Sequence, residues 1–211
     1  MKIFNFFLLS IFSLIFVTAE ELTLTPGPLT CEYKKKDKNE DYDVNTDTVI
    51  TCSGSSCSAD NGEIDVSDNI VSINTNGTYI LQGTLNGQIR VNVTEDEFVH
   101  LIFNSVDIKS SDGPAVYVTE ADKVTITLVG DSTLTDSTNY SDVVDEEPDA
   151  CLFVDSDLSI NGSGSLTVTG NYGDAIRCKK DLKIVSGNIK VPSAVERGIK
   201  ARNSICIEDR Y

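Results

Sequence analysis

The stretch INGSGSLTV at residues 160–168 returns, one residue shorter, as IVSGNIKV at residues 184–191. In both copies, aliphatic residues at fixed positions flank a polar corner that contains glycine. Leu158, Leu182 and Ile205 follow one another at steps of 24 and 23 residues, so the period extends over three copies. A strand motif that recurs with this period is typical of one rung of a parallel β-solenoid.

An earlier part of the chain shows nearly the same period. VHLIF at residues 99–103 matches VTITL at residues 124–128 at a spacing of 25 residues. One rung cannot bury its own apolar face, whereas stacked rungs about 4.8 Å apart hydrogen-bond to one another and enclose a continuous core. We therefore predict an all-β solenoid. A sandwich of antiparallel hairpins also contains short alternating strands, but it does not account for matches at a fixed period.

Aligning the last three rungs sorts their side chains into inward and outward columns. The inward columns are Leu152/Ile176/Ile199, Val154/Cys178/Ala201, Leu158/Leu182/Ile205 and Ile160/Ile184/Ile207. The outward columns are Phe153/Arg177/Lys200, Asp155/Lys179/Arg202 and Ser159/Lys183/Cys206. Because Cys178 falls in an aliphatic column, we predict that it is a core residue rather than half of a disulfide.

The N-terminal residues are typical of a secretory signal. Lys2 precedes an almost wholly apolar run at residues 3–17, and Val17, Thr18 and Ala19 form a small-residue cleavage site. We expect residues 1–19 to be a signal peptide and the protein to be secreted or held at the cell surface. No later segment of the sequence is long and apolar enough for a membrane span.

The charge of the chain argues against two classes of partner. The formal net charge is −16 over 211 residues. An acidic surface repels nucleic acid and anionic lipid, so we expect neither nucleic acid nor a membrane as a partner. The composition does not indicate an oligomeric state.

Residues 20–63 differ in composition from the rungs and are interpreted as a polar, cysteine-containing leader. Cys52 and Cys57 are plausible disulfide partners by proximity, but six cysteines leave the connectivity open. A zinc site is less plausible, since the chain has one histidine and no paired CxxC motif. Residues 64–211 are predicted to form the solenoid, with one rung carrying roughly ten extra residues between Leu134 and Cys151.

Several motifs are familiar in their order: VHLIFNSVDIKSSDGPAVYV, ADKVTITLVGDSTLTDS and DEEPDACLFVDSDLSINGSGSLTVTGNYGDAI. They resemble a family of secreted carbohydrate-binding domains that form right-handed parallel β-helices similar to pectate lyases. The resemblance covers residues 64–211 and implies calcium as a cofactor and plant cell-wall polysaccharide, namely acidic pectin or cellulose, as the partner. Domains of this family usually continue for further rungs, so the resemblance implies a C-terminally truncated β-helix.

Acidic residues recur at or near one corner of successive rungs, where they are candidate metal ligands. Hard oxygen ligands at closely spaced corners suit calcium, and a cation would relieve the repulsion between stacked carboxylates. Alternatively, each acid does no more than favour a turn. The motif implied by the resemblance falls on Asp174, whereas ERG at residues 196–198 departs from it. The candidates are Asp112, Glu146, Glu147, Asp149, Asp174 and Glu196.

Basic residues share two outward columns, where they are candidate ligands for a sugar carboxylate. Arg177 and Lys200 lie in one predicted column, and Lys179 and Arg202 lie in the next. An arginine fork pairs well with a carboxylate, so this strip is hypothesised to bind polygalacturonate. A solvated basic face is the alternative. Tyr172 is added as a ring that could stack on a sugar.

The combined interpretation is non-catalytic, calcium-dependent binding of acidic pectin, with cellulose as a further ligand. A calcium-dependent pectate lyase is the first alternative, because Arg177, Lys179 and Lys200 lie near acidic corners. A structural adhesin or surface module is the second. The lone His100 is predicted to face outward with no evident nucleophile, and no residue is assigned a catalytic role.

Overall fold

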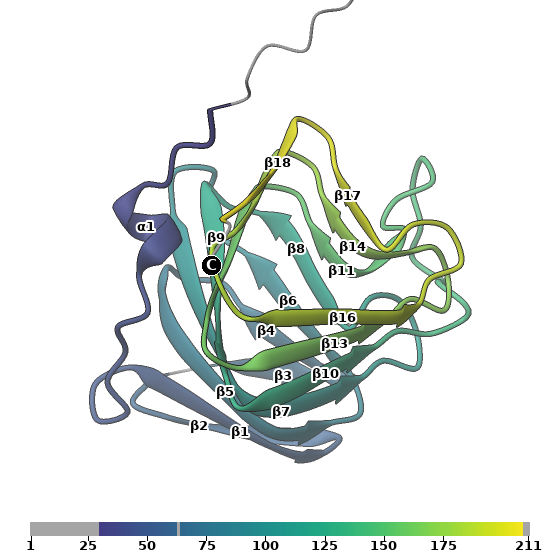
Figure 1. Cartoon of the computed structure of the whole chain (residues 1–211). Helices are drawn as coiled ribbons and strands as arrows, with labels where there is room; N and C mark the ends of the chain where they lie inside the picture. Colours follow the sequence, from purple (N-terminus) through teal and green to yellow (C-terminus); the bar gives the residue numbers. More distant parts are fainter. Residues whose placement is uncertain (1–29, 63, 209–211) are drawn as a thin grey trace, which may run out of the picture. The chain divides into compact units, whose positions relative to one another are not determined.

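A computed structural model describes residues 30–62 and 64–208, which contain one short helix and eighteen strands (Figure 1). In chain order these are α1 (Lys35–Lys38), β1 (Thr48–Gly54), β2 (Ser56–Asp60), β3 (Asp65–Ser67), β4 (Ile70–Ile73), β5 (Gly77–Leu85), β6 (Gln88–Asn92), β7 (Phe98–Lys109), β8 (Val116–Glu120), β9 (Lys123–Val129), β10 (Asp131–Thr135), β11 (Ala150–Val154), β12 (Asp157–Gly162), β13 (Ser165–Thr169), β14 (Asp174–Cys178), β15 (Asp181–Ile184), β16 (Asn188–Ser193), β17 (Ile199–Ala201) and β18 (Ser204–Ile207). The all-β prediction is confirmed. The predicted signal peptide, residues 1–19, lies outside the described residues.

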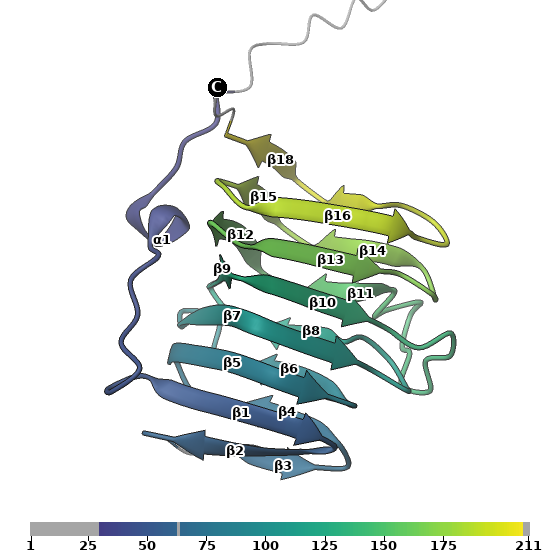
Figure 2. The ribbon, with the colours of Figure 1, turned by 60° about the horizontal axis from the view of Figure 1, so that its bottom comes forward.

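The strands form two sheets in which later rungs stack in parallel on earlier ones (Figure 2). The seven-stranded sheet has the order β17-β14-β11-β8-β6-β4-β3. The eleven-stranded sheet follows β16-β13-β10-β7-β9-β12-β15-β18, and β5, β1 and β2 extend it from β7. The pairs β1–β2 and β3–β4 are antiparallel, so both sheets are mixed. The described residues contain no helix with the length and apolarity of a membrane span.

The register of the sheets reproduces the spacings of the sequence repeat. Leu158 pairs with Leu182 and Leu182 with Ile205, and Val99 pairs with Val124. Side chains two dozen positions apart are therefore neighbours. The aliphatic ones are enclosed between the two sheets, where each fully buried side chain contributes about 1.5–3 kcal/mol.

The last rung departs from the predicted inward columns. Leu158 and Leu182 are fully buried, but Ile205 is 43% exposed and Ile207 is 64% exposed. Both residues lie on β18, which pairs with β15 on one side and forms the edge of the sheet among the described residues. The prediction that Ile205 and Ile207 are core residues is therefore wrong in this structure, because a strand at the edge of a stacked sheet is covered by a neighbouring strand on one side only.

The sheet begins earlier in the chain than the predicted domain boundary at residue 64. Strand β1 pairs in parallel with β5, with Ile50 opposite Leu81, and Ile50 is fully buried. Cys52 and Cys57 form a disulfide across the hairpin β1–β2, as their proximity indicated. The carbonyl oxygen of Cys52 lies 2.2 Å from where a Cβ on Gly83 would be, and the φ of Gly83 is +86°, so only glycine fits this approach.

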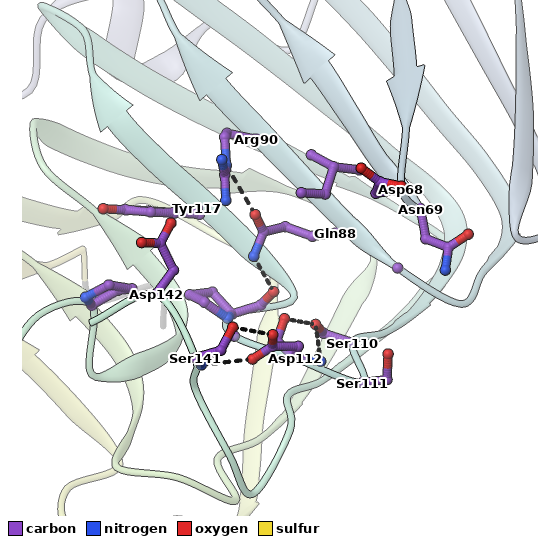
Figure 3. Close-up of a pocket in the computed structure, with 15 residues that line it drawn as sticks. Asp68, Asn69, Gln88, Arg90, Ser110, Ser111, Asp112, Tyr117, Ser141 and Asp142 are labelled. Atoms are coloured by element: carbon purple, nitrogen blue, oxygen red, sulfur yellow. Dashed lines mark hydrogen bonds between the residues drawn. The ribbon is translucent and has the colours of Figure 1, made fainter. Parts of the chain in front are cut away.

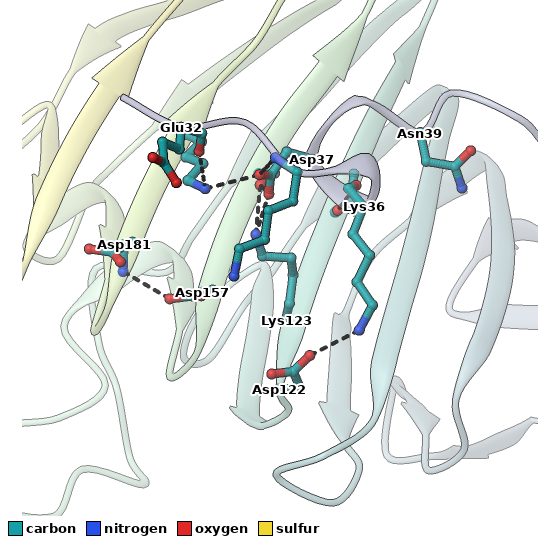
Figure 4. A network of polar contacts seen from close by, with 12 residues as sticks. Glu32, Lys36, Asp37, Asn39, Asp122, Lys123, Asp157 and Asp181 are labelled. Carbon is teal, nitrogen blue, oxygen red and sulfur yellow. Dashed lines mark hydrogen bonds and ion pairs between the residues drawn. The ribbon is translucent and has the colours of Figure 1, made fainter. Parts of the chain in front are cut away.

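Residues 31–40, here called the N-terminal strap, cross the outer face of β9, β12 and β15 (Figure 4). Asp37 is fully buried there and accepts hydrogen bonds from Ser159 Oγ at 2.7 Å and from the side-chain nitrogens of Lys123 and Lys183. A second disulfide joins Cys31 to Cys206 on β18. The strap is polar, and Asp37, its fully buried charged residue, is paired with polar groups of the sheet, whereas the buried hydroxyl of Tyr33 has no partner among the described residues.

His100 faces outward from β7, as predicted, but it is fully buried. Its Nε2 lies 2.7 Å from Thr127 Oγ1. Burial lowers the pKa of His100 to about 4, despite opposing effects of Asp47 and Asp41. This histidine is therefore neutral at physiological pH and forms part of the packed polar layer.

The two remaining cysteines, Cys151 and Cys178, are free and buried, which confirms the core position of Cys178. Burial raises the pKa of the Cys178 thiol to about 11 and that of Cys151 well above its ordinary value. Since the thiolate is the reactive form, the folded protein should not react with an aromatic disulfide reagent at pH 8. After unfolding in guanidinium, two thiols per chain should react. Rapid labelling of the folded protein would contradict this burial.

Candidate functional site

One outward column of the seven-stranded sheet carries side chains that stack from rung to rung. The register places Arg90 (β6) beside Tyr117 (β8), then Phe153 (β11), Arg177 (β14) and Lys200 (β17). We call these five residues the outer column. The rings of Tyr117 and Phe153 meet edge to face at 5.6 Å between centroids, and Arg90 and Arg177 lie over them at 5.6 and 5.5 Å. Each end of the aromatic pair is thus covered by a cation.

The long connection between β10 and β11 brings acidic residues against this column. Arg177 donates hydrogen bonds to Glu147 and Asp149, and Lys179 donates to Glu147. All four side chains are at least two-thirds buried. Residues predicted as metal ligands and residues predicted to bind sugar are therefore bonded to one another.

Asp174 lies at the start of β14 and is fully buried. Its Oδ1 accepts hydrogen bonds from the backbone nitrogen and Nε of Arg197, at 3.0 and 2.8 Å. Its Oδ2 has no hydrogen-bond partner among the described residues, and Lys200 Nζ lies 4.0 Å from it. We call Glu147, Asp149, Asp174, Arg177, Lys179 and Arg197 the acid–base cluster.

Asp149 has a similar unsatisfied atom. Its Oδ2 accepts from Arg177, whereas its buried Oδ1 has no partner in the described part of the chain. Asp149 and Asp174 belong to successive rungs, because the backbone nitrogen of Asp174 donates to the carbonyl oxygen of Asp149 at 2.8 Å. Two buried carboxylate oxygens thus have no hydrogen-bond partner among the described residues at this corner between successive rungs, which is uncommon in folded proteins.

The cluster borders a groove of about 730 Å³. Four predicted metal-ligating acids line it: Glu146, Glu147, Asp149 and Glu196. Three predicted sugar-binding residues line it as well: Tyr172, Arg177 and Lys200. Sequence reasoning therefore brought most of the candidate residues to one place, although it assigned them to two separate sites.

The ring of Tyr172 is held at the groove by a stack of two tyrosines. It lies parallel to Tyr140 with 4.0 Å between ring centroids. The hydroxyl of Tyr140 donates to Asp136 Oδ2 at 2.7 Å, and the backbone nitrogen of Asn171 donates to Asp136 Oδ1 at 2.6 Å. Burial raises the pKa of Asp136, and burial together with the charge of Asp136 raises that of Tyr140. Tyr172 itself is 36% exposed, so one face of its ring is open to a ligand.

Four predicted site residues do not line the groove: Asp174 and Lys179, which belong to the acid–base cluster beside it, and Asp112 and Arg202, which lie elsewhere. Asp112 lines a different pocket, where its carboxylate accepts hydrogen bonds from the backbone nitrogen and the hydroxyl of Ser141. Arg202 is exposed and has no ion pair with any described residue. The position of Asp112 follows from the inserted loop, which turns Ser141 towards it and so separates it from the other acids.

Arg197 is a site residue that sequence reasoning missed. It bonds to Asp174 and to Glu196, and it lines the groove. The sequence ERG at residues 196–198 was noted only as a departure from the family motif. The sequence did contain a signal for Arg197. It is a basic residue next to the predicted acidic corners of Asp174 and Glu196, and stacked carboxylates of like charge are stabilised by a cation between them.

The acid–base pairing also changes how the cations ionise. Burial alone would lower the pKa of Arg177, but the hydrogen bond and charge of Asp149, with Glu147, raise it above its ordinary value. The hydrogen bond to Asp174 likewise raises the pKa of Arg197. Both guanidinium groups are held in the charged form and are poor proton acceptors.

No group of three or more Asp, Glu, His or Cys side chains within residues 30–62 and 64–208 is already arranged to hold a metal ion. The open oxygens of Asp149 and Asp174 are nevertheless the hard donors that calcium prefers. These two residues fit the carboxylate part of a calcium site. Each of them also pairs through its other oxygen with an arginine, and Glu147 pairs with Arg177 and Lys179.

Comparison with known proteins identifies the family. The model of the family "carbohydrate-binding domain-containing protein" matches residues 67–210. The chain belongs to this family. A carbohydrate-binding domain-containing protein of Acetivibrio thermocellus is 36% identical over 155 residues, which cover 71% of this chain and 54% of the relative. This chain therefore spans about half the length of that carbohydrate-binding domain relative.

A solved structure shares the fold of this carbohydrate-binding domain chain. It is the polysaccharide lyase-like protein from C. thermocellum, in a gadolinium derivative, with a TM-score of 0.65 and 34% sequence identity. The match covers 69% of this chain and 61% of the solved chain. The family match and the fold match together confirm the resemblance in its coarse form, a carbohydrate-binding domain with a polysaccharide lyase-like fold.

Proposed function

We propose that this protein binds acidic plant cell-wall polysaccharide, with polygalacturonate preferred, in the groove beside the acid–base cluster and with the help of calcium. The observation that carries the proposal is that Asp149, Lys200 and the Tyr172 ring line one groove, and that Asp149 and the adjacent Asp174 each keep an unpaired carboxylate oxygen. Carboxylate-bearing sugars offer a partner for each of these groups.

Lys200 is the cation best placed to receive a sugar carboxylate. Its ammonium is 4.0 Å from Asp174 and makes no closer ion pair with any described residue. Arg177, by contrast, is shared between Glu147 and Asp149. The role of Arg177 is then to position these two acids, and the role of Lys200 is to bind the ligand directly. Tyr172 would stack on the sugar ring.

Asp149 and Asp174 would hold the calcium ion, with their open oxygens as ligands. A bound calcium would neutralise these acids and attract a uronate carboxylate to the groove.

Two finer features belong to the same proposal. We propose that the rungs wind right-handed, since crossover connections between parallel strands of one sheet are right-handed in about 98% of cases.

Secretion or attachment to the cell surface is supported by the disulfides Cys31–Cys206 and Cys52–Cys57, because disulfides persist in oxidising compartments. Cellulose is expected to bind more weakly than pectin, since the sequence contains no tryptophan to form a flat platform.

Reversing the charge of Lys200 tests the groove. Lys200→Glu should weaken binding to soluble polygalacturonate at least about tenfold in affinity electrophoresis, because an attractive contact becomes a repulsive one. Lys190→Glu on β16 is the matched control, since Lys190 is equally basic, exposed and outside the groove. Equal losses in the two variants would show that only net charge matters. No retention of the unmodified protein by pectin or cellulose would favour a structural surface module instead.

A pectate lyase is the second candidate, and the lyase-like fold of the solved neighbour favours it. The raised pKa of Arg177 keeps its guanidinium protonated at neutral pH, so the residue is not available to accept a proton. We therefore expect no turnover. Incubation with polygalacturonate and calcium should give no rise in ultraviolet absorbance from unsaturated product, and a calcium-dependent rise would establish the lyase.

A further inference from the structure

A second pocket, of about 320 Å³, lies at the other end of the outer column (Figure 3). Gln88, Arg90 and Tyr117 form one side of it, and Asp112 and Ser141 lie across from them. The volume is at the lower end of the range for small-molecule sites. The pocket shares no lining residue with the groove that contains Tyr172.

Arg90 is held rigidly in this pocket. Its Nε donates to Gln88 Oε1 at 3.1 Å, and its guanidinium lies over the ring of Tyr117. Gln88 is itself fixed, because it is 4% exposed and its Nε2 donates to the carbonyl oxygen of Pro114 at 2.8 Å. The conformational entropy that a ligand would have to remove from Arg90 is therefore small.

The terminal nitrogens of Arg90 make no hydrogen bond and no ion pair with the described residues. Arg177 and Arg197, in contrast, are each paired with carboxylates. In a chain with a net charge of −16, an ordered arginine that keeps its two terminal donors free is positioned for an external anion.

The remaining walls of the pocket favour a singly charged, hydroxylated ligand. Asp68, Asn69 and Asp142 line the pocket and offer acceptors for hydroxyl groups. The carboxylate of Asp112 already accepts two hydrogen bonds from Ser141, so it forms part of the pocket wall and is not counted as a partner for the ligand. A phosphate, with nearly two negative charges, would be repelled by these acids more strongly than a carboxylate. A sugar acid has hydroxyl groups for these acceptors and carries a single negative charge on its carboxylate, so it fits both features of the pocket.

We propose that this pocket is a second subsite that binds one uronate unit, with its carboxylate on the guanidinium of Arg90 and its ring against Tyr117. The ligand class rests on the proposed function, but the site is separate from the groove. Arg90 and Lys200, the cation proposed to bind the ligand in the groove, are four register steps apart in the outer column, roughly 19 Å. An oligosaccharide running along the column can therefore occupy both sites.

The test uses trigalacturonate as the probe and its methyl ester as a ligand of the same shape without charge. Calorimetry should show that Arg90→Gln weakens trigalacturonate binding about tenfold or more, while Lys190→Gln leaves it unchanged. Tyr117→Leu keeps the apolar contact with Phe153 and should weaken both ligands, because it removes the ring. Melting temperatures of all variants check that the fold is intact.

Soaking trigalacturonate into crystals of the full chain separates the two proposals. Density on Arg90 supports the subsite, even if the polymer does not bind the groove. Binding of the polymer with no density at Arg90 and no effect of Arg90→Gln overturns the subsite and leaves the proposed function intact. Absence of any density together with failure to bind polygalacturonate overturns both.

Discussion

Replacing Asp37 by alanine should lower the free energy of unfolding by about 3–5 kcal/mol, the cost of leaving buried charges without their partner. Asp37 is fully buried and pairs with Lys123 and Lys183, whose side chains are 7% and 13% exposed. Removing the carboxylate leaves both ammonium groups between strap and sheet with no compensating charge. Urea unfolding followed by circular dichroism measures the change.

The exposed ion pair Lys36–Asp122 is the matched control, since it also joins the strap to the sheet. Both of its side chains are about half exposed, so Asp122→Ala should cost at most about 1 kcal/mol. Equal effects of the two substitutions would contradict the description of the buried network.

The contribution of Asp37 should also depend on pH. Burial alone would raise its pKa, but hydrogen bonds from Lys123, Ser159, the backbone of Lys34 and Lys183 lower it far below the ordinary value of 3.8. A carboxyl group with a lowered pKa stabilises the folded state above its unfolded pKa, and this stabilisation is lost as the pH falls below it. The difference in stability between Asp37→Ala and the unmodified protein should therefore shrink steadily below about pH 3.8.

Removing the disulfide between Cys31 and Cys206 should have the second large effect. It closes a loop with a sequence separation of 175 residues, and the chain-entropy model assigns such a cross-link about 5 kcal/mol. The double variant Cys31→Ala with Cys206→Ala should lower the unfolding free energy by this amount, because the unfolded chain gains conformational freedom. The midpoint of urea unfolding reports it.

The second disulfide supplies the comparison. Cys52 and Cys57 are separated by 5 residues, so the same model predicts a loss of about 2 kcal/mol when both are replaced by alanine. A larger loss for Cys52–Cys57 than for Cys31–Cys206 would mean that the strap is not what holds the termini of the fold together.

The rungs were predictable because each one stacks on its own copy. Parallel pairing in register forces Leu158, Leu182 and Ile205 into one column, and the sequence must repeat to fill that column. The limit of this reasoning lies at the last rung. Periodicity alone does not say whether another strand stacks on Ile205 and Ile207.

The strap was not predictable from periodicity. Its ordering depends on Asp37 meeting Lys123 and Lys183, which are far from it in sequence and belong to different rungs. Nothing local in a polar segment with several lysines distinguishes an ordered strap from a solvated leader. Only the outward polar faces of β9, β12 and β15 determine where such a segment packs.

The candidate site was partly predictable. Stacked positions identified Arg177 and Lys200 as neighbours, and corner positions identified Asp149 and Asp174. The ion pairs between acids and bases were missed, because Glu147 and Asp149 reach Arg177 from the inserted loop, which has no repeat to align. Arg90 was missed for a different reason, since the column that contains it was aligned only over the last three rungs.

The most direct test of the central claim is the affinity of the full chain for oligogalacturonates too short to gel, measured by calorimetry with calcium and with a chelator. Calcium held by Asp149 and Asp174 should strengthen binding at least about tenfold, because it replaces the repulsion between protein and ligand carboxylates with attraction. Equal affinity in calcium and in chelator would contradict a calcium-assisted acidic-sugar site at this groove.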